Sequence, residues 1–334
     1  MQMPIADLHC DLLDYLESSP KKTVFDEELL CFVPKLRAGG VFFQVLAAYT
    51  DTNDVSAQRG VREANIFQNL DVKYPKDFLR IHNKNDVVCA KDQGKIGIIF
   101  AIENASGFST EEEPLDRCFQ RLEEIIKITS PILYISMTHF PENRFCGGNT
   151  TQNVGLKEDG KELLQYLSGR KIAIDLSHTS DASAHGILDF IAKRSLDFPV
   201  IASHSNFRAV EKHDRNLPDD LAKEIIRRKG LIGLNFIYDF IGHKSSDCFL
   251  RQIEHALKLG AEETLCFGAD FFDTKAVSLQ FNMPADHRFF HEGFDSSACY
   301  PKLIDLMKQK PDLKQNIIQN ITHRNVVRFL QSVL

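Results

Sequence analysis

The stretch Pro4-Ile5-Ala6-Asp7-Leu8-His9-Cys10-Asp11 is a short apolar run that ends in a histidine and an aspartate. A run of this length and composition favours a buried β-strand. Residues two apart on a strand point to the same side, so His9 and Asp11 are predicted to share one side of the run. A His-x-Asp pair is common by chance, and its significance therefore depends on the rest of the chain.

Apolar runs of the same kind recur along the chain and alternate with helical patterns. The further runs are Val41–Tyr49, Ile96–Glu103, Ile132–His139, Lys171–His178, Val200–His204, Leu231–Phe236 and Thr264–Asp270. Helices are predicted at Leu115–Ile128, Asp159–Leu167, Pro218 to about Arg228, and Thr322–Leu330. Eight strands that alternate with helices predict an α/β fold, a (β/α)8 TIM barrel, formed as one domain by residues 1–334.

Composition excludes several classes of function. The formal net charge is −6 and the basic residues are scattered, which argues against binding to nucleic acid or to an anionic membrane. The start of the chain lacks a basic secretory signal, and no apolar run reaches the ~18 residues of a membrane span. The eight cysteines include no C-x-x-C pair. We therefore expect free thiols in a reducing compartment and a cytoplasmic protein.

Histidines and acids gather where the predicted strands end. These residues are His9, Asp11, Glu103, His139, His178, His204 and Asp270. The carboxyl ends of barrel strands meet at one face, where barrel enzymes have their active sites. A single histidine at a strand end is more often structural, but the joint occurrence of four histidines with three acids favours a shared site. The other eight histidines, in loops or helices, are interpreted as surface or structural residues.

Imidazole and carboxylate ligands suit zinc and similar divalent ions. We expect His9 and Asp11 to hold one ion and His178 and His204 a second, with the two oxygens of Glu103 able to bridge them. Two neighbouring ions with a water between them generate hydroxide near neutral pH and polarise a carbonyl group.

Three other residues are candidates for the remaining chemistry. Asp270 is expected to carry the proton from the attacking water to the leaving amine. His139 is expected to donate a hydrogen bond to the developing oxyanion. Arg215 is expected to pair with a carboxylate of the substrate through its planar guanidinium.

At this point the chain resembles a known family. Asp7-Leu8-His9-Cys10-Asp11-Leu12 is similar to the D-x-H-x-D-L start of the membrane (renal) dipeptidase family. Further short motifs follow in the order of that family: Ala48-Tyr49-Thr50, Ile102-Glu103, Met137-Thr138-His139, Ile174-Asp175-Leu176-Ser177-His178, Ser203-His204-Ser205, Arg215-Asn216-Leu217-Pro218-Asp219-Asp220, Gly268-Ala269-Asp270-Phe271 and Asn325-Val326-Val327-Arg328. The resemblance therefore covers the whole chain.

The resemblance implies a dizinc (β/α)8 barrel that hydrolyses dipeptides, including those with a C-terminal D-amino acid. It implies zinc ligation by His9 and Asp11, by His178 and His204, and by a bridging Glu103. His139 and Arg215 match substrate-binding positions of the family, Asp270 matches its catalytic acid/base, and Tyr49 matches a substrate-contacting tyrosine. It also implies a homodimer.

The departures from the family pattern lie in loops around the expected pocket. The family motif D-F-D-G reads Asp270-Phe271-Phe272-Asp273 here, and the loop that follows it, through Phe289-Phe290-His291, is long and aromatic. The family tyrosine after strand seven is replaced by Ile237. The motif after His139 is loosened to Phe140-Pro141-Glu142-Asn143. These changes leave the metal set intact and are expected to reshape the pocket.

Two alternatives accompany the leading hypothesis. The altered loops favour hydrolysis of N-acyl amino acids or lactones on the same barrel. A non-catalytic metal-binding protein is disfavoured, because such a protein has no need of Asp270, His139 and Arg215. The abundant phenylalanines are interpreted as core and pocket lining rather than as a stacking platform for nucleic acid.

Overall fold

The computed structural model describes residues 2–334 except 244, 246 and 285. Its centre is a sheet of parallel strands in the order β7-β6-β5-β4-β2-β1-β9-β8. The bounds are β1 Ile5–Asp7, β2 Val41–Tyr49, β4 Ile96–Glu103, β5 Ile132–Ser136, β6 Ala173–Asp175, β7 Val200–Ile201, β8 Ile232–Leu234 and β9 Leu265–Phe267. Ala202, just after β7, closes the ring: its N–H donates to Leu231 O and its carbonyl accepts from Gly233 N, each at 2.8 Å. The predicted (β/α)8 barrel is confirmed.

The strand predictions differ from the structure in two ways. β2 and β4 have the predicted bounds, whereas the other six runs end as strands before their final residues. His9 and Asp11 therefore lie in the turn after β1, not on the strand, and their common direction comes from that turn. A ninth strand, β3 (Phe78–Arg80), was not predicted; it pairs with the beginning of β4. Its three residues are too few to give a periodic signal.

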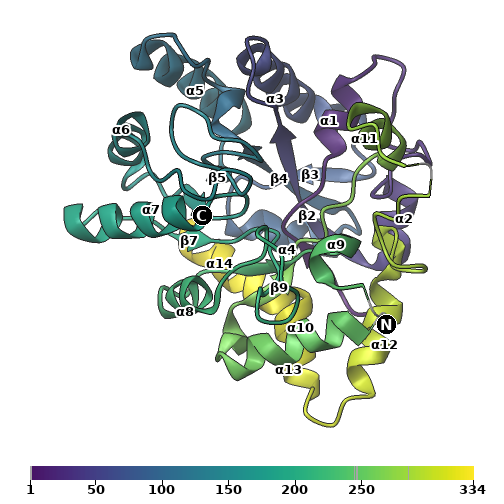
Figure 1. The fold of residues 1–334 in the computed structure, drawn as a ribbon. Helices are drawn as coiled ribbons and strands as arrows, with labels where there is room; N and C mark the ends of the chain where they lie inside the picture. The colour runs from purple at the N-terminus through teal and green to yellow at the C-terminus, as the bar shows by residue number, and fades with distance from the viewer. Residues whose placement is uncertain (1, 244, 246, 285) are drawn as a thin grey trace.

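Helices form a ring around the barrel (Figure 1). They are α1 Leu12–Glu17, α2 Val33–Gly39, α3 Ser56–Lys73, α4 Lys84–Asp92, α5 Leu115–Thr129, α6 Glu158–Leu167, α7 Asp181–Arg194, α8 Asp219–Arg227, α9 Tyr238–Ile241, α10 Asp247–Lys258, α11 Thr274–Gln280, α12 Tyr300–Lys308, α13 Gln315–Gln319 and α14 Asn325–Val333. The predicted helices match α5, α6 and α8 closely. The predicted helix at Thr322–Leu330 is α14, preceded by a π-helical turn at Asn320–Arg324.

The core has two layers, inside and outside the barrel wall. Inside, Phe43, Val45 and Ile99 pack in one cluster with Val326 and Phe329 of α14. α14 also contacts β1 and β9, so this last helix closes the amino-terminal end of the barrel. Outside, apolar faces of the surrounding helices cover the strands. Each large apolar side chain buried in this way stabilises the fold by roughly 1.5–3 kcal/mol.

Two glycines let the last strands approach the segment that carries His204. A Cβ atom at Gly233 or at Gly268 would collide with the carbonyl oxygen of Ser203. Only glycine permits this approach, which brings the ends of β8 and β9 against the turn after β7.

Across residues 2–334, leaving aside the three undescribed positions, no helix combines the length and the apolarity that a membrane crossing requires.

Candidate metal centre and active site

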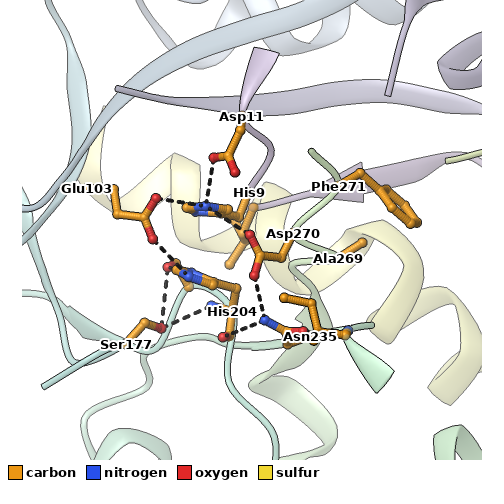
Figure 2. A network of polar contacts seen from close by, with 12 residues as sticks. His9, Asp11, Glu103, Ser177, His204, Asn235, Ala269, Asp270 and Phe271 are labelled. Atoms are coloured by element: carbon orange, nitrogen blue, oxygen red, sulfur yellow. Dashed lines mark hydrogen bonds and ion pairs between the residues drawn. The ribbon is translucent and has the colours of Figure 1, made fainter. Parts of the chain in front are cut away.

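The predicted site residues meet at the carboxyl end of the barrel, around a cavity of about 200 Å³. Figure 2 shows the carboxylates of Asp11, Glu103 and Asp270 turned toward the ring of His9, with His204 below them. The predicted metal ligands, together with His139 and Asp270, lie at or just after the ends of six strands, β1, β4, β5, β6, β7 and β9, and the closure of the barrel is what brings them together. Seven side chains form what we call the floor of the site: His9, Asp11, Glu103, His139, His178, His204 and Asp270.

His9 is the centre of the first half of the floor. Its Nε2 lies 3.5 Å from Asp11 Oδ1, 3.3 Å from Glu103 Oε2 and 3.5 Å from Asp270 Oδ1. The His9 ring is completely buried. The buried His9 ring therefore presents one nitrogen to three carboxylate oxygens. Burial lowers the pKa of His9, but Tyr134, Glu103 and Asp11 hold it well above the usual value.

Glu103 connects this half of the floor to the other. While its Oε2 faces His9, its Oε1 lies 3.0 Å from His178 Nε2 and 3.2 Å from His204 Nε2. Those two histidine nitrogens are 2.9 Å apart. Burial would raise the pKa of Glu103, but His9, His178 and His204 lower it well below its usual value. Glu103 is therefore an ionised carboxylate with one oxygen toward each group of ligands.

Two floor residues have an unusual backbone. His178 and Asp270 have φ angles of +67° and +65°, in the left-handed region that side chains other than glycine rarely adopt. Each costs roughly 1–2 kcal/mol relative to an ordinary conformation. Such strain persists where surrounding contacts impose it, and it is frequent at functional sites.

Buried partners fix the orientation of the histidines. His9 Nδ1 lies 2.7 Å from Tyr134 Oη, whose hydroxyl donates to Leu8 O. His204 Nδ1 lies 2.6 Å from Ser203 Oγ, which is also 2.6 Å from Asp175 Oδ2. Holding Nδ1 in this way directs Nε2 into the site, as partners of metal-bound histidines do. Sequence analysis did not assign these roles, although Asp175 and Ser203 belong to the quoted motifs.

Asp270 is held by a residue that sequence analysis also left without a role. Asn235 Nδ2 donates to Asp270 Oδ2 at 2.9 Å, which leaves Oδ1 facing His9. Burial raises the pKa of Asp270 to about 7, the charges of Asp11 and Glu103 add to the rise, and His9 and Arg215 oppose it. A bound cation would lower this pKa, because positive charge favours the carboxylate. Beside a bound cation the carboxyl group would therefore be ionised, which suits it to accept a proton.

His139 and Tyr49 lie together on one side of the cavity. Their rings meet edge to face with centroids 4.8 Å apart, and the Tyr49 hydroxyl donates to Asp51 Oδ1 at 2.7 Å. Burial, with a contribution from Arg215, lowers the pKa of His139 to about 4. At neutral pH His139 is therefore uncharged and has one N–H to donate.

Arg215 is buried beside the floor but does not line the cavity. Its Nη1 donates to Ser205 Oγ and its Nη2 to His204 O, both at 2.9 Å. Among the described residues its Nε has no hydrogen-bond partner. A guanidinium group has five N–H donors, so some remain free for another ligand.

The walls of the cavity are mostly apolar. They comprise Phe140, Ile237, Phe240, Phe272, Ala276, Val277, Phe281, Met283 and Phe289, with Gln280, Asp14, Asp239 and His287 beside them. The expectation that the altered loops shape the pocket is therefore met by Phe140, Ile237, Phe272 and Phe289. His287, interpreted with the other loop histidines as a surface or structural residue, is half-buried and lines the cavity. Its position in an irregular loop gave no signal.

The donor set fits metal ions. Three groups of ligand atoms each lie within 4.8 Å of one another: His9 with Glu103 and His204, Glu103 with His139 and His178, and His9 with Asp11 and Asp270. His9 Nε2 and Asp11 Oδ1 are buried and find no hydrogen-bond partner among the described residues. Buried polar atoms without partners are costly, and a cation among them would satisfy both. These groups differ from the predicted ligand pairs in two ways. His204 falls with His9 and Glu103 instead of with His178, and His139, which was not predicted as a ligand, falls with His178 and Glu103.

A (β/α)8 barrel with histidines and carboxylates converging at the ends of its strands is the architecture of metal-dependent hydrolases. A sequence model of one such family, the membrane dipeptidases (peptidase family M19), matches residues 1–334. The chain belongs to this family, and the predicted family resemblance is confirmed.

Individual relatives agree with this assignment. The chain is 24% identical over 289 residues to an uncharacterized dipeptidase of Schizosaccharomyces pombe, a match that covers 83% of this chain and 63% of the relative. A metallo peptidase from Rhodobacter sphaeroides, solved with a phosphinate mimic of the dipeptide L-Ala-D-Ala, is 19% identical with a TM-score of 0.81 and full coverage of both chains. An amidohydrolase from Pseudomonas aeruginosa is 20% identical with a TM-score of 0.77, covering 99% of this chain and 96% of that one. At these identities the two structures show the fold alone.

Proposed function

We propose that this chain is a dizinc dipeptidase that hydrolyses the peptide bond of dipeptides, including those with a C-terminal D-amino acid. The observation that carries the proposal is the two-sided position of Glu103, with Oε2 3.3 Å from His9 and Oε1 3.0 and 3.2 Å from His178 and His204. Family membership and the dipeptide mimic bound by the Rhodobacter relative support the substrate. The proposal treats residues 1–334 as a single domain.

In this proposal His9 and Asp11 would hold one zinc ion, His178 and His204 would hold the other, and Glu103 would contribute to both. Zinc, when bound, acts as a Lewis acid that polarises the carbonyl group and lowers the pKa of water. The chain's own residues do the rest. Asp270 takes the proton of the water that attacks the carbonyl carbon. It then gives that proton to the amine nitrogen as the C–N bond breaks.

His139 and Arg215 are proposed to position the substrate. Uncharged at neutral pH, His139 donates its N–H to the oxygen that gains negative charge in the transition state. Arg215 attracts the substrate carboxylate through its remaining donors, and Tyr49 lines the side of the cavity next to His139. The carboxylates of Asp14 and Asp239 in the same cavity favour a free α-ammonium group, which dipeptides have and N-acyl amino acids lack.

The test is to measure zinc content and dipeptide hydrolysis of the purified protein with and without a chelator. Stoichiometric zinc with chelator-sensitive hydrolysis supports the proposal, whereas substoichiometric zinc together with no such activity would overturn it. Asp270→Asn should retain zinc and lower kcat by about 10²–10⁴-fold, because proton transfer is lost. Asp116→Asn, an exposed carboxylate on α5 that does not line the cavity, is the control and should leave kcat unchanged.

A second candidate is hydrolysis of N-acyl amino acids or lactones. The apolar walls that include Phe272 and Phe289 favour it, since such walls suit an acyl chain as well as a side chain. Comparing kcat/KM for Phe-Ala and for N-acetyl-Ala decides between the two. A value for the N-acyl substrate above that for the dipeptide would favour this candidate.

A further inference from the structure

One wall of the cavity comes from a segment that differs from the rest of the barrel. We call the described residues of the segment 272–289, all but residue 285, the roof; it contains Phe272, α11 and Phe289. None of the residues of α11 is buried. The positions Ala276, Val277 and Gln280 line the cavity, whereas Leu279 points away and is 84% exposed. The helix therefore presents one face to the cavity and the other to water.

Contacts at the two ends of α11 hold the roof next to the cavity. At its start, Asp273 accepts from the backbone N–H groups of Lys275 and Ala276 and pairs with Lys22 at 3.3 Å. At its end, Gln280 Nε2 donates to Asp51 Oδ2 at 3.3 Å, and the ring of Phe281 meets that of Phe140 edge to face at 6.2 Å. α11 thus spans from the turn after α1 to the loops after β2 and β5.

The chemistry of the cavity is apolar with a negative rim. Ile237 and Phe240 also line the cavity, close to the end of the roof, where Tyr238 N–H donates to Phe289 O at 2.7 Å. The charged lining groups include the carboxylates of Asp14, which pairs with Arg59, and Asp239, which lies 3.3 Å from His243, and no Lys or Arg is found among the described lining residues. A bulky apolar side chain would gain from burial here, and an acidic one would meet like charge.

We propose that the roof is a specificity element that selects dipeptides carrying one bulky apolar side chain, such as Phe, Leu or Met, over those with small or acidic side chains. This inference rests on the proposed function and adds the substrate class to it. Phe281 and Val277 provide the contact that distinguishes the substrates. A larger apolar group in an apolar pocket gains roughly 10–200-fold in kcat/KM for each added methylene at best.

The experiment measures kcat/KM of the zinc-loaded protein for Ala-Ala, Leu-Ala, Phe-Ala and Glu-Ala and for the reversed dipeptides. In one of the two orders, the Phe substrate should exceed Ala-Ala by roughly tenfold or more, with the Glu substrate lowest. Phe281→Ala should reduce the Phe-to-Ala ratio by roughly tenfold while hydrolysis of Ala-Ala continues. Leu279→Ala, on the outer face of the same helix, is the matched control and should leave the ratio unchanged.

Binding of phosphinate dipeptide mimics with methyl or benzyl side chains, measured by calorimetry, separates the two proposals. Hydrolysis without preference for apolar bulk, or a preference that Phe281→Ala leaves intact, would overturn the roof as a specificity element and leave the dipeptidase standing. Tighter binding of the benzyl mimic without hydrolysis of any dipeptide would support the roof and overturn the activity. Neither binding nor hydrolysis would overturn both.

Discussion

The floor and the roof of the cavity are built in opposite ways. Floor residues such as His9 and His204 are fully buried, held by hydrogen-bonded partners, and anchored on turns that leave barrel strands. The roof has a helix with no buried residue, and Phe281 and Met283 beside it are 43% and 36% exposed. The floor side chains are held by buried hydrogen-bonded partners, whereas the roof is held mainly by contacts at the two ends of α11.

This difference divides function between the two regions. The floor carries the motifs that match the dipeptidase family, so its geometry supports the shared reaction. The roof begins at Phe272, where the sequence departs from the family motif, and its apolar face lines the cavity. Changes in the floor should therefore affect metal binding and rate, whereas changes in the roof should affect which substrate is preferred.

The largest effect is expected from Glu103→Gln. Removing the charge leaves His178, His204 and His9 without their shared carboxylate, so zinc content should fall and kcat/KM should drop by about 10³-fold or more. Metal analysis and a dipeptide assay provide the measurement. The control is Glu113→Gln, a loop glutamate paired with Arg121 outside the cavity. Near wild-type turnover of Glu103→Gln would refute the bridging role.

A smaller effect is expected from Ser203→Ala, which removes the partner of His204 Nδ1. Loss of a hydrogen bond that orients a metal ligand typically weakens metal affinity by about 10–100-fold. Competition with a chelator measures the affinity. Ser278→Ala is the matched change in the roof, because among the described residues Ser278 Oγ donates to Thr274 O of its own helix and to no other group. Equal effects of the two substitutions would contradict the distinction between floor and roof.

Limited proteolysis should distinguish the regions without any substitution. Because α11 buries no side chain, its local opening should cost less than global unfolding, and the first cuts are expected after Lys275 with trypsin and after Leu279 or Phe281 with chymotrypsin. Chelation should change the rate of these cuts by less than about twofold, since the metal ligands lie in the floor. Initial cleavage between β4 and α5 would show that the roof is the more stable region.

The smallest effect is expected from Glu113→Gln, in the loop that precedes α5. Hydrogen bonds from Arg121 lower the pKa of Glu113 to about 2. Since this folded-state pKa lies below the unfolded value, the pair stabilises the protein above about pH 4.5, and the contribution is lost as pH falls toward 2. Glu113→Gln should therefore lower the free energy of unfolding by about 1 kcal/mol at pH 7 and flatten its acid dependence, measured by urea denaturation between pH 7 and 3. The exposed neighbour Glu112→Gln is the control and should change neither.

Much of the barrel and the floor was predictable from sequence because each floor residue ends an apolar run. The runs predicted the strands in their order along the chain. Because the carboxyl ends of parallel strands meet at one face of a barrel, the same pattern predicted that Glu103, His178 and His204 lie together. The turn geometry was not predictable, since the positive φ angles at His178 and Asp270 depend on contacts from distant segments. The predicted cytoplasmic location and homodimer stay predictions.

The roof was predictable only in outline. The aromatic loop after Asp270 was visible as a departure from the family, but which of its residues face the cavity depends on how Asp273 and Gln280 anchor the helix. Residues that orient others, such as Tyr134 and Asn235, were missed for a similar reason. Their partners, His9 and Asp270, lie far away in the sequence, and no local pattern records such a pairing.

The position of β1 in the ring determines when, during synthesis of the chain, the site can form. β1 pairs on one side with β2 and on the other with β9, and the backbone N–H of Asp270 donates to the carbonyl of His9. On the ribosome, His9 is synthesised long before Asp270, and its neighbours are complete only when residues beyond 270 have been made. A nascent chain that has not yet reached Asp270 therefore has no complete candidate metal pocket, and a metal ion would find its full set of ligands only after that point.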